Sequence, residues 1–339
     1  MRRKIFVLIG IALLLVACQF PLLSPQATAT PVSLANALLT PNPNLAPSRT
    51  PFQPVYPTAQ NTPTATLTST ATQPAGTPTL PTSPNQMNIL LLGSDWRSYS
   101  SGARTDVMLL ISLNPDTGFV SLVSFPRDLW VNIPGIGEQR INTAQEFGGF
   151  ALTQATFKNN FNLRIDRYIE TNFSGFQAIV NTLGGITVDA SVSLYDRCDL
   201  SWRNSSGYCY IPAGEVQMNG ATALWYVRSR ESTSDFDRTR RAQEVIMGIF
   251  QKLMSLNAVT RAPALFSEFS SDIDTDLSLS DLTTYLPLAT TVMADQSKIH
   301  RYAVGSSLAT GYITPAGADV LLPNYAGIEA LLQQALSGQ

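Results

Sequence analysis

The sequence contains little of the side-chain chemistry on which many enzymes and metal proteins depend. Its 339 residues include one histidine, His300, and three cysteines. A Ser-His-Asp triad needs a histidine held between two partners, and structural zinc sites need four ligands, mainly histidine and cysteine. His300 stands alone in a strand-like stretch, where an ordinary core or surface role is the simpler interpretation. Histidine-based catalysis and zinc binding are therefore poorly supported.

Charge is also scarce, at 14% of residues, and every acidic residue lies after position 86. From Met87 onward there are 18 basic and 24 acidic residues, which gives a net charge of −6. Domains that bind nucleic acid generally present a basic patch or stripe. The composition therefore argues against a nucleic-acid partner, and a local arginine cluster would stand against an acidic background.

Long hydrophobic runs are missing except for Ile5–Val16 near the start. That run is shorter than the roughly 20 apolar residues of a membrane-spanning helix. The basic residues before it and the sequence LVAC ending at Cys18 are typical of a bacterial lipoprotein signal. We expect residues 1–18 to be a signal peptide and Cys18 to be the lipidation site. A plain signal peptide or short anchor with an incidental cysteine is the alternative.

Residues 19–86 are rich in Pro, Thr, Ser and Ala, with fourteen of the 22 prolines and Arg49 as their only charge. Such a composition buries too little apolar surface to offset the entropy of ordering. We predict a disordered linker, spanning on the order of 45 Å as a flexible coil and up to roughly 200 Å as polyproline helix.

The two remaining cysteines, Cys198 and Cys209, flank a polar loop. In an exported protein such a pair is typical of a disulfide that closes the loop. We expect it to steady a flap near the functional site without taking part in chemistry.

One apolar run and one hairpin pattern bring acidic and basic residues to the same place. Ile89–Leu92 has the character of a buried strand that ends just before Asp95, where α/β sheets gather functional groups, although such an Asp is often only a turn former. The next segment predicts a hairpin whose paired residue numbers sum to about 233, so that Asp106 faces Arg127. A bulge at Gly118 would slip this register by one.

If the first strand runs parallel to the outgoing hairpin strand, Asp95 and Arg104 reach the same sheet edge as Asp106 and Arg127. A functional site and a plain cross-strand ion pair are both open interpretations of this arrangement.

Alternating patterns downstream predict an α/β fold with a mixed sheet. Residues 152–160 have helical character, 164–172 and 186–190 have strand character, and a helix is expected between them from Ser174. Residues 259–339 are expected to form a C-terminal extension packed on the same domain, with a strand near 299–304 and an amphipathic helix near 326–335.

The segment Tyr226–Glu244, YVRSRESTSDFDRTRRAQE, holds five arginines and no lysine. The planar guanidinium fork meets phosphate or carboxylate oxygens two at a time, so the segment indicates anion recognition. A solvated helix face is the alternative. If YVRSR were a strand, Arg228 and Arg230 would share one face of it.

Asp235 is expected to cap the following helix, on which Arg238 and Arg241 share a face three residues apart. Arg240 points elsewhere on that helix and is expected to be a surface residue.

These pieces together resemble the LytR-CpsA-Psr family over roughly Met87–Leu253. The resemblance is carried by the order NILLLGSD, RTD, SFPRD, INTAQEFGG, NFSGFQAIVNTLGGI, NGATALWYVRSR and DFDRTRRAQ. It implies a three-layer α/β/α fold with a central mixed sheet and a catalytic domain over residues 87–258. It also implies a lipid-anchored enzyme on the outer face of the bacterial cytoplasmic membrane.

The implied activity is phosphotransfer of a glycopolymer from a polyprenyl pyrophosphate carrier to a cell-wall acceptor such as peptidoglycan, with Mg²⁺, or Mn²⁺ in its place. Carried over by position, Asp95 and Asp106 would hold the metal with Arg104 beside them, and Asp235 matches the acidic residue before Arg238. The implied pyrophosphate ligands are Arg127, Arg228, Arg230, Arg238 and Arg241.

Two positions depart from the family pattern: Asp237 stands where a glycine is frequent, and Ala242 where a glutamine is frequent. The lipid tail needs an apolar channel, for which Phe161, Phe173, Phe176 and Ile179 are candidates that could equally be plain core. Two other functions fit the same residues, namely a polyprenyl-pyrophosphate hydrolase and a non-catalytic module that binds anionic glycans.

Overall fold

The structure, a computed structural model, describes residues 80, 83–95, 104–256 and 258–338. The expected signal peptide, the lipidation site and nearly all of the expected linker lie outside these residues. The described end of the linker packs on the folded domain: Leu80 is 3% exposed in the main core, and Gln86 donates to Ser112 Oγ at 2.7 Å. Within the described residues, no helix is long and apolar enough to cross a membrane.

A six-stranded mixed sheet forms the centre of the domain, in the order β11-β6-β1-β2-β3-β12. β1 is parallel to β6 and antiparallel to β2, while β3 is antiparallel to β2 and parallel to β12. The strands are β1 (Met87–Ser94), β2 (Thr105–Asn114), β3 (Phe119–Phe125), β6 (Arg167–Asn172), β11 (Asp274–Thr275) and β12 (Ile299–Ala303). The carboxyl ends of β1, β3 and β6 therefore meet at one edge.

The register of the β2–β3 hairpin is the predicted one, with Met108 opposite Phe125. At the other side of β2, the pairing with β1 shifts between Gly93 and Ser94. Gly93 faces Val107 and Ser94 faces Thr105, so Asp106 is the extra residue of a β-bulge. Bulges re-aim side chains and are frequent near active sites. Asp106 is thus placed by a local irregularity at the edge where β1 and β3 end.

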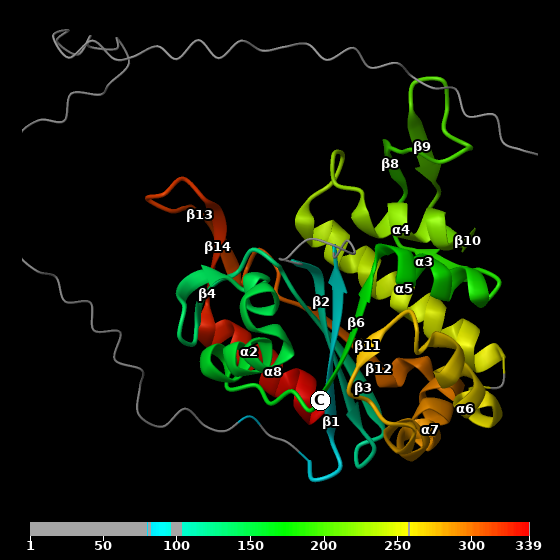
Figure 1. Cartoon of the computed structure of the whole chain (residues 1–339), viewed down its shortest axis with the longest axis horizontal. Helices are drawn as coiled ribbons and strands as arrows, with labels where there is room; N and C mark the ends of the chain where they lie inside the picture. Colours follow the sequence, from blue (N-terminus) through cyan, green and yellow to red (C-terminus); the bar gives the residue numbers. More distant parts are fainter. Residues whose placement is uncertain (1–79, 81–82, 96–103, 257, 339) are drawn as a thin grey trace, which may run out of the picture. The chain divides into compact units, whose positions relative to one another are not determined.

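Helices cover both faces of the sheet, which confirms the predicted three-layer α/β/α fold (Figure 1). On one face α2 and α8 pack on β1, β2 and β3 around Phe125 and Phe157, while α5 and α7 pack on the other face. The helices are α2 (Thr143–Phe161), α3 (Phe173–Thr182), α4 (Gly220–Arg228), α5 (Asp235–Ser255), α6 (Ala258–Phe269), α7 (Leu279–Ala294) and α8 (Tyr325–Ser337), with a 3-10 turn at Gln296–Lys298.

Among the described residues, four two-stranded sheets surround this centre: β4 with β5, β7 with β10, β8 with β9 and β13 with β14. Their bounds are β4 (Trp130–Ile133), β5 (Gly137–Arg140), β7 (Ile186–Ala190), β8 (Leu194–Arg197), β9 (Tyr208–Ile211), β10 (Gly214–Met218), β13 (Ala309–Ile313) and β14 (Asp319–Pro323). A second core lies between β7, β10, α3, α4 and α5. The β13–β14 hairpin was not predicted from the sequence.

Two expectations about the chain are corrected by the structure. YVRSR is not a strand: Tyr226, Val227 and Arg228 form the last turn of α4, and Ser229 and Arg230 lie in the loop after it. The helix begins after Asn219, whose side chain accepts a hydrogen bond from Thr222 N–H. Asp235 is the first residue of α5 rather than its cap, because the cap is Ser234. Ser234 and Asp237 form a reciprocal capping box, which gives Asp237, the departure from the family glycine, a local role.

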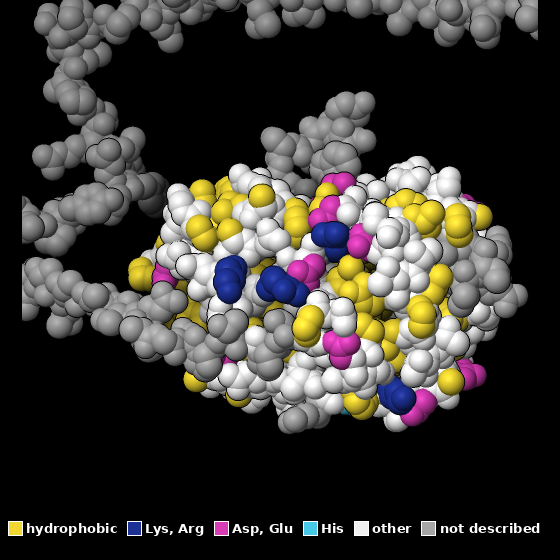
Figure 2. Space-filling model, turned by 90° about the horizontal axis from the view of Figure 1, so that it is seen from below, with side chains coloured by type: hydrophobic (Ala, Val, Ile, Leu, Met, Phe, Trp, Pro, Cys, Tyr) yellow, Lys and Arg dark blue, Asp and Glu magenta, His cyan; other side chains and the backbone are white. Residues whose placement is uncertain are grey.

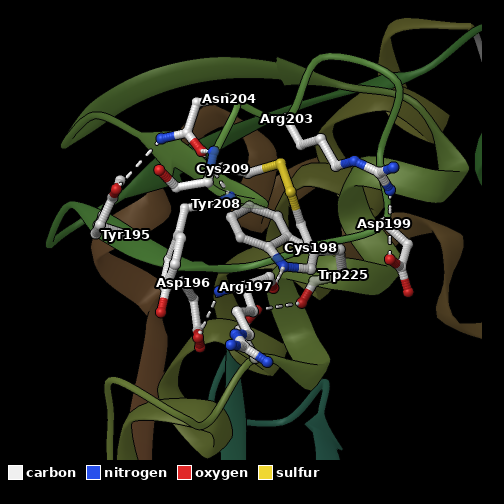
Figure 3. The surroundings of a disulfide bond; sticks show 12 residues. Tyr195, Asp196, Arg197, Cys198, Asp199, Arg203, Asn204, Tyr208, Cys209 and Trp225 are labelled. Atoms are coloured by element: carbon white, nitrogen blue, oxygen red, sulfur yellow. Dashed lines mark hydrogen bonds and ion pairs between the residues drawn. A yellow bond between two sulfur atoms is a disulfide. The ribbon is translucent and has the colours of Figure 1, made fainter.

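The predicted disulfide between Cys198 and Cys209 is present, with Cα atoms 5.8 Å apart. It closes the loop of the β8–β9 hairpin (Figure 3). Trp225 Nε1 on α4 donates to Arg197 O at 2.6 Å, and Glu231 N donates to the buried Asp196 carboxylate at 3.2 Å. The hairpin is therefore tied both to α4 and to the loop that follows it.

Both sulfurs should be unavailable to alkylating reagents in protein prepared under oxidising conditions. Replacing Cys198 and Cys209 by Ser should lower the free energy of unfolding by about 3 kcal/mol or less, because so short a loop loses little unfolded-state entropy on closure. Peptide mapping by mass spectrometry, with denaturant unfolding of the two forms, measures both effects. Recovery of alkylated Cys198 and Cys209 peptides from unreduced protein would contradict the assignment.

Candidate functional site

A long apolar cavity of about 610 Å³ lies between the central sheet and helices α3 to α7. Its lining follows β1 from Met87 to Gly93, about 20 Å at ~3.3 Å per residue. Aliphatic and aromatic side chains from every surrounding element form the wall. Of the four residues that the sequence offered as candidates for lining a lipid-tail channel, Phe173, Phe176 and Ile179 line this cavity. Phe161 does not, because it packs in the core beneath α2 on the opposite face of the sheet.

Charged residues line the cavity mainly at the end where β1 and β3 terminate. Five of the sequence-predicted site residues are among them, carried by β2, the turn after β3, α4 with the loop that follows it, and α5. These residues are Asp106, Arg127, Arg228, Arg230 and Arg238. The fold thus joins one apolar compartment to one strongly charged mouth, which we call the arginine cluster.

Arg127 is held by carboxylates on two sides. It pairs with Asp106 across the hairpin, as predicted, and its Nε lies 3.3 Å from Asp128 Oδ2. Asp128 is held in turn by Arg140, whose Nε lies 3.1 Å from Oδ1. Burial works against the charge of Arg127, but its hydrogen bond to Asp106 and the nearby acidic charges raise its pKa. Arg127 is therefore a fixed and permanently charged group at the mouth.

Arg238 approaches the same point from the first turn of α5. Its Nη2 donates to Asp106 O at 3.2 Å and lies 2.7 Å from Asp235 Oδ1. Burial lowers the pKa of Arg238, and the charge of Asp235 opposes that shift. The second oxygen of Asp235, Oδ2, is buried and makes no hydrogen bond within the described structure. One buried carboxylate oxygen beside Arg238 thus has no hydrogen-bond partner among the described residues.

Arg228 and Arg230 are the exposed members of the cluster. The Arg228 guanidinium lies 4.2 Å from the centroid of the Phe173 ring. Such stacking orients the planar fork while leaving its edge available for hydrogen bonds. Arg230 lies two residues beyond the end of α4, in the loop that is tied to the β8–β9 hairpin.

Arg241 is placed differently from the other predicted ligands. It is 1% exposed, and Nε donates to Tyr226 O at 2.7 Å while the other nitrogens donate to Ser229 O and Thr233 Oγ1. It is outside the cavity lining and instead holds the loop that carries Arg230. Arg240 turns to the opposite side, where it pairs with Glu244 at 2.6 Å.

Asp95 and Arg104 lie together at the end of β1, as the sequence predicts. Asp95 N donates to Arg104 O at 3.2 Å, and Arg104 N donates to Asp95 Oδ1 at 3.0 Å. Asp95 is exposed and is not among the described residues that line the cavity. The Arg104 side chain pairs with Glu146 of α2 at 3.2 Å.

No group of three or more His, Cys, Asp or Glu residues is arranged to hold a metal ion within the described ranges. Seen from below, the surface shows hydrophobic side chains between small groups of basic and acidic residues (Figure 2).

The fold and cluster define a class of protein: an α/β/α domain in which an apolar cavity opens on a cluster of arginines. The sequence profile of the LytR_cpsA_psr family matches residues 55–320. The chain belongs to the LytR_cpsA_psr family.

Comparison with individual proteins gives the same result. The chain is 35% identical over 208 residues to the polyisoprenyl-teichoic acid–peptidoglycan teichoic acid transferase TagU of Oceanobacillus iheyensis, covering 59% of this chain and 62% of TagU. The chain thus spans about three fifths of that relative.

Solved structures are similar in fold. The crystal structure of TagV from B. subtilis aligns with a TM-score of 0.62 at 24% identity, covering 74% of this chain and 97% of TagV. A structure of TagT bound to LI-WTA aligns with a TM-score of 0.57 at 27% identity, covering 74% and 91%.

Replacing Arg241 by Lys should destabilise the domain, whereas replacing Arg230 by Lys should not. A single ammonium group cannot reach three separate acceptors, and each buried acceptor left unpaired costs about 1–3 kcal/mol. The exposed Arg230 should change stability by no more than about 0.5 kcal/mol. Thermal and denaturant unfolding of the two variants measures the difference. Equal stability of both variants would show that the Arg241 contacts do not hold the loop.

Proposed function

We propose that the chain is an extracytoplasmic phosphotransferase that moves a glycopolymer phosphate from a polyprenyl pyrophosphate carrier to a cell-wall acceptor. The observation that carries this proposal is the continuity between the apolar cavity and the arginine cluster. A lipid pyrophosphate has the matching parts, an apolar tail joined directly to a doubly phosphorylated head. The names of relatives such as TagU, a teichoic acid transferase, support the same substrate class.

The polyprenyl tail would occupy the cavity beneath α5 and α7. A closed apolar void of this volume would cost about 15 kcal/mol at ~24 cal/mol per Å³, as much as the stability of a whole domain. An apolar occupant that restores those contacts suits the cavity, and a water-filled one does not, because its walls offer few polar partners. Phe173 and Phe176 would contact the tail near the head group.

The pyrophosphate would lie among Arg127, Arg228, Arg230 and Arg238. Their guanidinium groups come from different elements and can approach the phosphate oxygens from different sides. Arg241 would act through the loop and would not touch the substrate. Transfer of a phosphoryl group requires mainly positioning and neutralisation of charge, which suits a chain with arginines and acids but no histidine at the site.

A divalent cation, Mg²⁺ or Mn²⁺, fits this site as a further element of the proposal. Mg²⁺ usually binds through one or two carboxylates together with substrate phosphate oxygens. Asp235 offers the unpaired buried oxygen, and Asp106 and Asp95 offer carboxylates at the same sheet edge. When bound, the cation would neutralise charge on the pyrophosphate.

In the transfer step, an acceptor hydroxyl would attack the phosphorus next to the glycan. A new P–O bond to the acceptor forms, the P–O–P bond breaks, and polyprenyl phosphate leaves. Asp95, exposed at the end of β1, would take the proton of the hydroxyl, with Arg104 N–H fixing its orientation. An anchor at Cys18 would keep the domain at the outer face of the cytoplasmic membrane, where both substrates meet.

A hydrolase would use the same site with water in place of the acceptor, and a binding module would hold the glycan without turnover. Incubating the purified protein with a labelled lipid-linked glycan and wall fragments separates these functions. The transferase gives label covalently attached to wall, the hydrolase gives free glycan phosphate, and the module gives retention alone. Either of the last two results would overturn the proposal.

Substitutions should separate the arginines from the acids. Arg228→Lys and Arg230→Lys keep the charge but lose the bidentate fork, so affinity for the lipid pyrophosphate and the transfer rate should both fall about tenfold or more. Asp106→Ala should lower the rate and weaken its dependence on Mg²⁺ while leaving considerable affinity. Rates and affinities across a Mg²⁺ titration provide the test, with Arg203→Lys on the hairpin loop as a matched control. Wild-type rates in both Lys variants, or activity independent of metal, would refute the assignment.

The length of the polyprenyl tail provides a test of whether the tail occupies the cavity. Ala242 lines it and is 6% exposed, so Ala242→Phe should place a ring in the path of the tail. We expect affinity for a long-chain polyprenyl donor to fall at least tenfold and affinity for a short-chain analogue to change little. Binding of both donors to the variant and the wild type measures this. Equal losses for the two chain lengths would place the tail elsewhere.

A further inference from the structure

The outer face of the β8–β9 hairpin carries an unusual set of side chains. Tyr195 and Tyr210 pair directly across the two strands, and Arg197 pairs with Tyr208. Tyr195 and Tyr210 are 51% and 55% exposed, and the Tyr195 and Tyr208 rings are stacked, with centroids 5.0 Å apart and planes 10° from parallel. We call Tyr195, Tyr208 and Tyr210 the tyrosine platform.

The alternation of the strands separates this platform from the hairpin's own core. Leu194, Cys209 and Ile211 face inward and are buried, so the tyrosines are not needed to bury the hairpin. The disulfide and the stacked rings make the ribbon stiff, and Asn204 Nδ2 donates to the Tyr195 hydroxyl at 3.3 Å (Figure 3). Large exposed aromatic groups held rigidly are typical of recognition surfaces.

The platform is continuous with the loop of the arginine cluster. Arg197 Nε lies 3.7 Å from Glu231 Oε2, and Glu231 is the neighbour of Arg230 in the chain. The hairpin projects beyond α4, on the side toward which β1 and β6 point (Figure 1). A long molecule bound to the platform would therefore pass the mouth of the cavity.

We propose that the tyrosine platform binds the sugar chain of the wall acceptor, so that an acceptor hydroxyl is presented to the arginine cluster. This inference rests on the proposed transferase function. The weakly positive C–H groups on one face of a pyranose ring match the negative face of an aromatic ring. The tyrosine hydroxyls and Asn204 supply hydrogen bonds for the sugar's polar edge.

Charge and size favour a sugar chain on the tyrosine platform over an anionic membrane, an anionic polymer or a second copy of this protein. Residues 191–211 contain two acidic and two basic residues, so the hairpin has no net charge. An anionic membrane surface attracts clustered Lys and Arg side chains by about 1 kcal/mol each, and an anionic polymer would also require such a cluster. A stable contact between two copies buries more than about 1,000 Å², whereas this ribbon is only four residues, about 14 Å, long. A sugar chain without strong net charge fits best.

The test measures binding of soluble, uncrosslinked peptidoglycan strands to the full chain by calorimetry. Tyr195→Ala combined with Tyr210→Ala should weaken binding at least tenfold. Tyr195→Phe combined with Tyr210→Phe keeps the rings and should stay within about threefold of wild type. Tyr312→Ala, which removes a 43% exposed tyrosine from the distant β13–β14 hairpin, should have no effect.

A second measurement separates this inference from the transferase proposal. In the transfer assay the Ala pair should raise the KM for the acceptor at least tenfold and leave kcat and affinity for the lipid-linked donor unchanged. If the wild type transfers nothing, strand binding still decides the role of the platform.

Wild-type strand binding by the Ala pair would overturn the inference, and so would an equal loss in the Phe pair, which would exclude ring stacking. Loss of binding to anionic phospholipid vesicles by the Ala pair, with strand binding intact, would assign the platform to the membrane instead.

Discussion

The repulsion between arginines at the cavity mouth is the constraint on which the rest of the site depends. Two like charges about 6 Å apart repel by about 3 kcal/mol at an effective dielectric constant near 20. Asp106, Asp128 and Asp235 offset this cost, and each is placed by a different local structure: a β-bulge, the turn between β3 and β4, and the first turn of α5. The hairpin register and the capping box are therefore electrostatic requirements as much as elements of the fold. Arg228 and Arg230 are the exposed members of the cluster, and the proposed pyrophosphate would supply the remaining negative charge.

Most of the residues that meet at the sheet edge could be predicted from the sequence, because strand pairing follows simple rules. Side chains alternate between the two faces of a strand, and the turn from Asn114 to Gly118 sets which residues pair, so Asp106 could be predicted opposite Arg127. The parallel direction of β1 and β3 then predicted Asp95 and Arg104 at the same edge. The β-bulge at Asp106 was not readable, because it depends on the pairing of β1 with β2 on the other side.

The arginine segment was predicted less well. Spacing alone left YVRSR open to a strand, yet Asn219 caps a helix whose apolar side fills the second core, and this tertiary packing determines the structure. Arg238 and Arg241 share a helix face, but the loop from Ser229 to Thr233 folds over only one of them. Arg238 therefore lines the cavity, whereas Arg241, three residues later, holds the loop. The cavity itself arises from long-range packing of five helices, which no local pattern records.

The edges of the central sheet have a consequence for how the chain becomes a folded protein. β11 and β12, which close the two edges, and α8, which completes the main core, all come from the last 66 residues, Asp274–Gln339. A chain that emerges with its N-terminus first exposes the unpaired sides of β3 and β6 until this segment follows. Unpaired strand edges invite association with other chains. The sheet is therefore completed late in synthesis, and a chain cut short before residue 274 would leave a four-stranded sheet with two unpaired edges.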